Sequence, residues 1–163
     1  MASLSGAKSQ TLYEVREMDE SKLAEVMAIE CSAYEFPWTK SMFGSSLSSN
    51  DECCLMYVDD TLVGYSIVSY ILDEAHLLNI CISPIYEGLG YGRLLLKDLI
   101  ERARENRSVW FFLEVRESNT RAVNLYFSEG FNEVGVRPNY YPSKKGREDA
   151  YLMTLDLSID VIV

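Results

Sequence analysis

The segment from residue 75 to residue 115 restricts the fold more than any other part of the sequence. An apolar run over 75–83 ends at Pro84, and three glycines follow within ten residues. Next come apolar residues that share one broad helical face, and then a second apolar run over 109–115. This order predicts strand, Gly-rich turn, helix and strand, with the last strand apolar enough to be buried on both faces.

Strands and helices are also expected before this segment. The strand patterns lie at residues 13–16, 53–58 and 62–72. Asp59 and Asp60 separate the second pattern from the third, as in a hairpin. Helical spacing starts after Asp19, stops before Pro37 and resumes after Thr39, which can cap the second helix. The order of elements up to residue 115 is therefore typical of a mixed α/β fold.

The C-terminal part adds a helix and a strand pair. Asn119 is placed to cap the helix, which closes at Gly130. Strands are expected at 131–136 and 150–157, paired antiparallel around a polar loop at 143–149. The complete order is β, α, α, β, β, β, α, β, α, β, β.

A length of 163 residues suits one compact domain. We expect a flexible leader over 1–10, the domain over 11–157 and a short tail over 158–163. The leader lacks the apolar run of a signal peptide, and no window reaches the roughly 18 apolar residues of a membrane span. These features predict a soluble cytoplasmic protein without a membrane partner.

The charge and the cysteines restrict the partners. A net charge of −10 repels nucleic acid and anionic lipid but attracts cationic substrates, so no direct nucleic-acid partner is expected. The cysteines at 31, 53, 54 and 81 form no C-x-x-C, and His76 is the single histidine. They are expected to be buried, reduced thiols, with no metal site. The oligomeric state is left open.

The Gly-rich turn is a possible anion site. Gly88, Gly90 and Gly92 stand just before a helix, where backbone N–H groups are unpaired and attract a group such as a pyrophosphate. The spacing is neither the G-x-G-x-x-G of dinucleotide sites nor a P-loop. By itself, the turn is equally compatible with a tight connection.

The string Ile80-Cys-Ile-Ser-Pro, followed by Glu87-Gly-Leu-Gly-Tyr-Gly, resembles the acyl-CoA-binding motif of the Gcn5-related N-acetyltransferases, the GNAT family. The resemblance implies a single-domain α/β GNAT fold, with splayed parallel strands in a mixed central sheet and flanking helices, and acetyl-CoA as co-substrate. Glu87 replaces the usual Gln or Arg, and its charge would disfavour a pyrophosphate unless it turns to solvent or pairs with Arg93. The resemblance therefore carries over only the backbone of the turn, namely Gly88, Leu89, Gly90, Tyr91, Gly92 and Arg93.

Further strings between Tyr13 and Leu157 resemble the GNAT members that acetylate the N-terminal alanine of a bacterial small-subunit ribosomal protein. These strings, in order, are Phe36-Pro-Trp-Thr, Leu72-Asp-Glu-Ala, Leu78-Asn-Ile, Leu113-Glu-Val-Arg, Ser118-Asn, Leu125-Tyr, Gly130-Phe-Asn and Asn139-Tyr-Tyr-Pro. The resemblance implies direct attack of the alanine α-amine on acetyl-CoA in a ternary complex. No cysteine has a histidine partner in the sequence pattern, which argues against an enzyme thioester.

The resemblance also implies a cofactor cleft. The pantetheine arm would enter where strands 75–83 and 109–115 splay, along the backbone of Ile80, Cys81 and Ile82. The side chain of Asn119 would contact the cofactor in addition to capping its helix.

Glu114 and Tyr126 are the candidate catalytic residues. A carboxylate in an apolar strand is costly to bury alone, and the residue pattern fits pairing with Arg116 or Arg121 as well as it fits catalysis. Tyr126, taken by its pattern, fits core packing. The resemblance implies that Glu114 is the general base and that Tyr126 is the acid that protonates the leaving thiolate.

Aromatic residues in expected loops are candidates for acceptor binding. Trp38, Tyr140 and Tyr141 either shield the ends of the sheet or, by the resemblance, line a groove for a peptide terminus. Two other functions stay open at this point. One is acetylation of a small amine such as a polyamine or an aminoglycoside, and the other is a non-catalytic acyl-CoA-binding module.

Overall fold

The computed structural model describes residues 12–159, in which the elements follow the expected order. The expected leader, 1–10, and residues 160–163 of the expected tail lie outside the described residues. The strands are β1 (Tyr13–Glu17), β2 (Glu52–Val58), β3 (Thr61–Ile71), β4 (Glu74–Ile82), β5 (Trp110–Arg116), β6 (Asn132–Ser143) and β7 (Gly146–Asp156). The helices are α1 (Leu23–Ala33), α2 (Lys40–Ser48), α3 (Tyr91–Glu105) and α4 (Thr120–Ser128).

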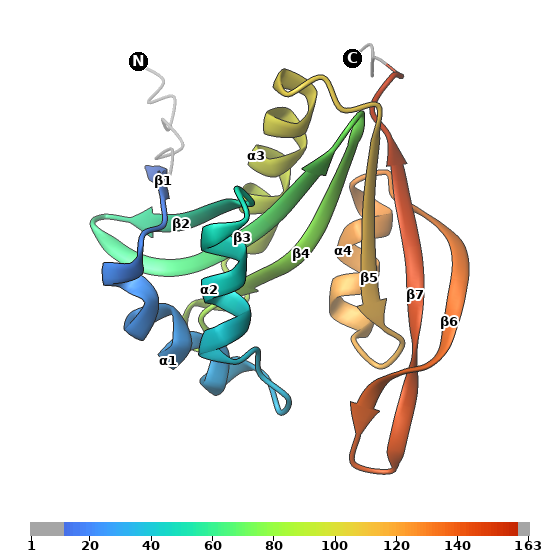
Figure 1. The fold of residues 1–163 in the computed structure, drawn as a ribbon, viewed down its shortest axis with the longest axis horizontal. Helices are drawn as coiled ribbons and strands as arrows, with labels where there is room; N and C mark the ends of the chain where they lie inside the picture. The colour runs from blue at the N-terminus through green and yellow to red at the C-terminus, as the bar shows by residue number, and fades with distance from the viewer. Residues whose placement is uncertain (1–11, 160–163) are drawn as a thin grey trace, which may run out of the picture.

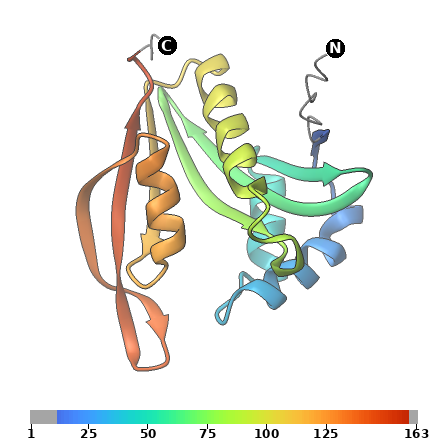
Figure 2. The same ribbon diagram turned by 180° about the vertical axis from the view of Figure 1, so that it is seen from behind.

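All strands form one mixed sheet in the order β1-β2-β3-β4-β5-β7-β6. Helices α1 and α2 cover one face of its first half, whereas α3 and α4 lie on the opposite face (Figure 1; Figure 2). No helix lies in front of β5, β7 and β6 in the view of Figure 1. The face of β5 that points toward the viewer in Figure 1 is therefore not covered by a helix and can form part of a binding site.

The centre of the sheet splays as expected. β4 and β5 are parallel, and their pairing runs from Glu74 opposite Trp110 to Leu77 opposite Leu113. Beyond that point β4 continues to Ile82 and β5 to Arg116 without pairing to each other. The backbone edges that face each other there are left available for a ligand.

Each face of the sheet has its own hydrophobic core. One buried cluster joins α3 to β4 and β5 and includes Leu95, Leu99, Phe111 and Tyr126. The other joins α1 and α2 to β2 and β3 and includes Phe43. The first cluster also takes in residues of β2 and β3, so it continues across both halves of the sheet, whereas the second is confined to the first half.

Local signals explain the element boundaries. Asp19 caps a 3₁₀ turn through the Ser21 N–H at 2.8 Å, and α1 follows it. Oγ1 of Thr39 accepts a hydrogen bond from the Met42 N–H at 3.3 Å, as expected for a cap. Among the residues described, no helix is long and apolar enough to cross a membrane.

Two predictions about strands are wrong. β5 buries one face and leaves the alternate residues partly exposed, because no helix covers its other side. The polar stretch 143–149 is mostly strand, since β6 ends at Ser143 and β7 begins at Gly146. A hairpin arm that meets solvent on both faces can be polar throughout, so its composition resembled that of a loop.

Candidate active site

A cavity of about 1210 Å³ opens between β4, the start of α3 and α4. Its lining includes most of the residues expected to hold the cofactor, namely Ile80, Cys81, Ile82, Gly88, Gly90, Tyr91, Gly92, Arg93 and Asn119, together with Tyr126. Leu89 belongs to the same turn, but its side chain is exposed and is not among the lining residues. Glu114, Trp38, Tyr140 and Tyr141 do not line this cavity either.

The Gly-rich turn offers its backbone to the cavity. Gly88 and Gly90 have φ angles of +80° and +87°, and a Cβ on either residue would meet no atom within 4 Å. The first hydrogen bond of α3 runs from the Leu94 N–H to the Gly90 carbonyl at 3.2 Å. The N–H groups of the first turn therefore lack helical partners, which fits an anion such as the pyrophosphate of CoA.

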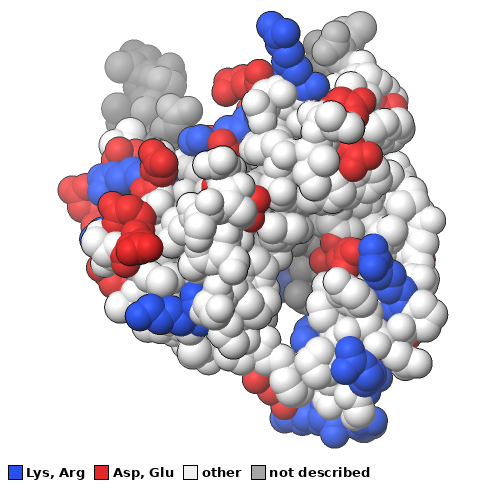
Figure 3. Space-filling view, viewed as in Figure 1, with Lys and Arg blue, Asp and Glu red and all other residues white. Residues whose placement is uncertain are grey.

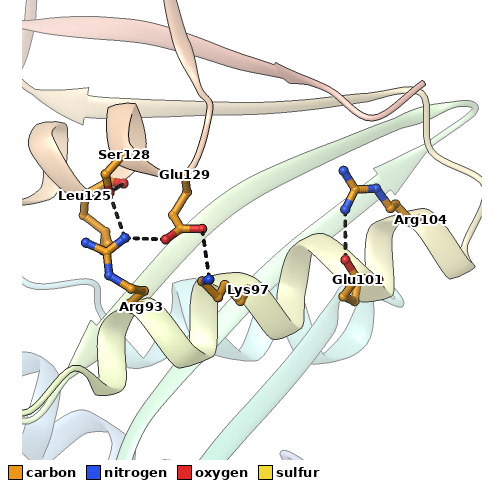
Figure 4. Close-up of polar contacts among 7 residues, drawn as sticks. All are labelled: Arg93, Lys97, Glu101, Arg104, Leu125, Ser128 and Glu129. Atoms are coloured by element: carbon orange, nitrogen blue, oxygen red, sulfur yellow. Dashed lines mark hydrogen bonds and ion pairs between the residues drawn. The ribbon is translucent and has the colours of Figure 1, made fainter. Parts of the chain in front are cut away.

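Ion pairs cross the rim of the cavity. Arg93 donates to the Ser128 hydroxyl at 2.8 Å and to Glu129, which Lys97 also approaches at 3.9 Å (Figure 4). Glu87 pairs with Arg121 at 3.2 Å, not with Arg93. The negative charge that Glu87 introduces into the family motif is thus paired with Arg121, a cation on α4.

The edge of β4 meets a residue that the sequence analysis missed. The Tyr34 hydroxyl donates to the Ile80 carbonyl at 2.8 Å, and both residues line the cavity. Burial raises the pKa of the Cys81 thiol to about 11, so this thiol is protonated at neutral pH. Cys53 and Cys54 are also buried, but Cys31 is exposed, contrary to the prediction, because it lies on the solvent side of α1.

Asn119 and Tyr126 are both placed by α4. Oδ1 of Asn119 accepts from the Ala122 N–H at 3.2 Å, so the predicted cap is confirmed. Tyr126 is buried at the cavity wall and packs against Phe131, with 5.7 Å between ring centroids. Burial, and next to it the phenol of Tyr141, raises the pKa of Tyr126. Its hydroxyl therefore keeps its proton over the physiological range.

Glu114 lies on the open face of β5, just beyond the last pair with β4. Its Oε1 is 3.0 Å from Nε of Arg137, so the cationic partner is neither Arg116 nor Arg121, the two that the residue pattern offered as the alternative to catalysis. The prediction missed Arg137 because it lies on β6, beyond the intervening β7. The interaction of the Tyr140 phenol with Glu114, together with burial, raises the pKa of that phenol.

A bulge in β6 sets Tyr140 and Tyr141 beside Glu114. The pairing with β7 shifts between Arg137, opposite Ala150, and Tyr141, opposite Glu148. Asp149 accepts from the Asn139 N–H at 2.9 Å. Arg147 fixes the other side of the bulge by donating to the carbonyls of Asn139 and Tyr140, each at 2.8 Å. A bulge commonly redirects side chains next to a site in this way.

Tyr141 interacts electrostatically with both candidate catalytic residues. Burial, followed by the charge of Glu114, raises its pKa to about 12, and Tyr141 in turn raises the pKa of Tyr126. The electrostatic influence of Tyr141 thus reaches the carboxylate on the open face and the phenol at the cavity wall.

Arg116 joins the loop after α1 to the β6–β7 hairpin. It donates to the Pro142 carbonyl at 2.6 Å and pairs with Glu148 at 2.9 Å. Its guanidinium also lies over the rings of Tyr141 and Phe36, at 4.4 and 5.5 Å from their centroids. Although burial of Glu148 acts in the opposite direction, hydrogen bonds from Ser118 and Arg116 lower its pKa. The sequence pattern indicates Arg116 as a candidate partner of Glu114 and gives no signal of this bridging role.

Trp38 is held by a buried carboxyl group. Its backbone N–H donates to Glu30 at 2.9 Å, and the centroid of its ring lies 5.2 Å from that of Phe43. Glu30 is 1% exposed and also accepts hydrogen bonds from the hydroxyl of Tyr65 and from Asn79, the latter at 3.2 Å. Trp38 thus packs into the core under the α1–α2 loop, while Phe36 of the same loop lines the cavity.

Charges are unevenly spread on the face of Figure 1. Acidic side chains gather over the N-terminal half, and basic ones gather at the end of the β6–β7 hairpin (Figure 3). Lys144, Lys145 and Arg147 of this hairpin line the cavity. Within residues 12–159, no group of three or more His, Cys, Asp or Glu side chains is arranged to hold a metal ion.

The sequence is similar to a family of known activity. The profile of the Acetyltransferase (GNAT) family matches residues 23–131. The ribosomal protein bS18-alanine N-acetyltransferase of Haemophilus influenzae is 40% identical over 146 residues, which cover 87% of this chain and 95% of that protein. The protein of the same name from Salmonella typhimurium is 37% identical over 142 residues, with coverages of 87% and 96%.

Solved structures show the same likeness. The ribosomal-protein-S18-alanine N-acetyltransferase from Escherichia coli matches with a TM-score of 0.86 and 35% identity, covering 93% of this chain and 97% of that one. A chimera of a Vibrio cholerae spermidine N-acetyltransferase matches with a TM-score of 0.80 and 18% identity, covering 90% and 96%. At this lower identity, the likeness extends to the fold alone.

Proposed function

Because this chain belongs to the Acetyltransferase (GNAT) family, we propose that it transfers the acetyl group of acetyl-CoA to the N-terminal alanine of a small-subunit ribosomal protein. The observation that carries the proposal is the similarity to the bS18-alanine N-acetyltransferases, which extends over nearly their full length. The proposal includes action in the cytoplasm, without direct contact to nucleic acid or membrane.

The cofactor half of the site is proposed to use mostly backbone groups. The N–H groups of Gly88 to Arg93 would hold the pyrophosphate at the start of α3. The splayed edge from Ile80 to Ile82 would hold the pantetheine arm, with Asn119 as a further contact. The positive φ angles of Gly88 and Gly90 and the open cavity support this placement.

In the catalytic half, we propose that one residue removes a proton from the amine and that another supplies a proton to the leaving thiolate. Glu114 takes a proton from the α-ammonium, directly or through one water, because an ammonium with a pKa of about 7.7 to 8.0 cannot attack until it is neutral. The amine nitrogen then forms a bond to the thioester carbonyl carbon, and the C–S bond breaks. Tyr126 gives its proton to the departing thiolate, and the second proton that the attacking nitrogen loses restores the phenol.

Direct attack agrees with the state of the cysteine in the cavity. A thioester on the enzyme needs a thiolate nucleophile, but burial raises the pKa of Cys81 to about 11. The thiol is thus almost entirely protonated at neutral pH. The proposed reaction therefore proceeds in a ternary complex of protein, acetyl-CoA and peptide.

Release of free thiol from acetyl-CoA tests this function. The acceptors are short peptides that begin with Ala-Arg, Ser-Arg or Met-Arg, and spermidine is the small amine. We expect the highest kcat/KM with the Ala-Arg peptide. A higher value with spermidine would favour the small-amine function, and no thiol release with any acceptor would favour a non-catalytic module.

A further inference from the structure

Arg137 reaches Glu114 across an intervening strand. The strands follow the order β5-β7-β6, so Arg137 on β6 and Glu114 on β5 are separated by β7. Ala150 of β7 pairs with Arg137 on one side and with Arg116 of β5 on the other. Its small side chain leaves room above the strand, and Nε of Arg137 comes within 3.0 Å of Oε1 of Glu114.

Among the groups around Glu114, Arg137 is the cation that pairs with its carboxylate. Tyr140 and Tyr141 approach the carboxylate as phenols. Arg116, two residues along β5, is held by Glu148 and by the Pro142 carbonyl. Among the described residues, the ion pair with Arg137 is the one that Glu114 forms. The carboxylate of the proposed base is thus already paired with a cation.

We propose that Arg137 pairs with Glu114 in the absence of the acceptor, in the place of the acceptor's ammonium group. The α-ammonium of the peptide replaces Arg137 when it binds. This inference rests on the proposed function. Guanidinium and ammonium are both cationic donors and compete for the same carboxylate oxygens. Arg137 is therefore a residue that sets the affinity for the acceptor and takes no part in proton transfer.

The exposure of the pair permits the exchange. The side chain of Arg137 is 54% exposed, compared with 26% for Glu114. Its guanidinium carbon also lies over the ring of Tyr140, 5.4 Å from the ring centroid. Arg137 can therefore swing into solvent without opening either core. The incoming ammonium gains one ion pair while the protein gives up another, which weakens acceptor binding.

Replacement of Arg137 by glutamine tests the proposal. Arg137→Gln removes the competing charge, so the KM for the Ala-Arg peptide should fall by about twofold to fivefold, the range in which exposed ion pairs contribute. The kcat should stay within about twofold, because Arg137 is absent from the reacting groups. Calorimetric titration of the peptide into protein saturated with CoA should show the same gain in affinity.

Two further variants serve as controls. Arg137→Lys keeps the charge and should keep a KM close to that of the unchanged protein. Arg104→Gln removes another exposed arginine, which pairs with Glu101 on α3 at 2.9 Å, and should change nothing (Figure 4). A KM that rises or stays the same in Arg137→Gln would overturn the proposal. If the unchanged protein neither acetylates nor binds the peptide, the proposed function fails as well, so the two failures are distinguishable.

Discussion

Arg121 and Glu87 face each other at the cavity that is proposed to receive CoA, with Nη1 of Arg121 3.2 Å from Oε2 of Glu87. Glu87→Gln should release this arginine and remove a negative charge beside the anion site. CoA should then bind about twofold to fivefold more tightly at low salt, since both side chains are largely exposed. The gain should shrink near physiological ionic strength, where the screening length is about 8 Å.

Calorimetric titration with CoA at low and at physiological salt measures this effect. Glu101→Gln is the matched control, because Glu101 pairs with Arg104 on α3 outside the cavity. Weaker CoA binding in Glu87→Gln would mean that Glu87 positions Arg121 for the ligand.

Gly92 tests whether the cavity takes the cofactor. A Cβ at Gly92 would lie 3.7 Å from Ile82 and 3.9 Å from Leu125, at ordinary contact distances. Gly92→Val should therefore fold, while its methyl groups fill the space between β4 and α4. Saturating acetyl-CoA should stabilise the unchanged protein by about 2.7 kcal/mol at a hundredfold excess over Kd, but should not stabilise the variant. Thermal melting measures both, with Gly44→Val in α2 as a control that keeps the shift.

Glu114→Gln should show a loss of activity that depends on pH. The amide keeps the shape of the side chain but cannot accept a proton, so kcat/KM at pH 7 should fall by a factor on the order of 10² to 10⁴. At pH 9 most α-amine is neutral, since its pKa is about 7.7 to 8.0, and activity should partly return. Initial rates of thiol release across this range measure the effect. Full activity at every pH would exclude Glu114 as the base.

Tyr126→Phe should lose a comparable factor without recovery at high pH. Burial raises the pKa of this phenol, so the unchanged protein keeps the donor through pH 9. The variant lacks a proton for the leaving thiolate, and a neutral amine does not supply one. The same thiol-release profile decides the matter. A profile that matches that of Glu114→Gln would disprove the division between base and acid.

Glu30→Ala should destabilise the fold strongly. It would leave three donors without their acceptor, namely the backbone N–H of Trp38, the Tyr65 hydroxyl and the side-chain amide of Asn79. Each buried unpaired donor costs about 1 to 3 kcal/mol, so the free energy of unfolding should drop by about 3 kcal/mol or more. Urea denaturation measures this drop. Glu30→Gln, which keeps one acceptor oxygen, should lose less.

The backbone of the site was predictable because it follows from local signals. Gly88, Gly90 and Gly92 indicate a turn whose backbone can approach a ligand and whose N–H groups are unpaired. The structure shows positive φ angles at Gly88 and Gly90, whereas Gly92 lies within the first turn of α3. Thr39 and Asn119 cap their helices as predicted, because a cap needs only a suitable side chain within three residues. The splay of β4 and β5 came from the family resemblance.

The side-chain contacts between distant strands were not predictable in this way. The pair of Arg137 and Glu114 depends on the order β5-β7-β6 and on the register across Ala150, which no local pattern encodes. Glu30 did leave a signal, since a carboxylate shares the helical spacing of Leu23 and Val26 on a buried face. Two of its three partners come from β3 and β4, and these strands meet α1 only in the folded protein.

The short parallel contact between β4 and β5 has a mechanical consequence. The strands on either side of it come from continuous stretches of chain, β1 to β4 before α3 and β5 to β7 after it. The ladder that joins them stops at Leu77 and Leu113, while each half continues past that point. A molecule that forms hydrogen bonds to both free edges completes the ladder and links the two halves of the sheet. Stiffness of the whole sheet should therefore rise with ligand occupancy, and slower amide hydrogen exchange in β4 and β5 would report it.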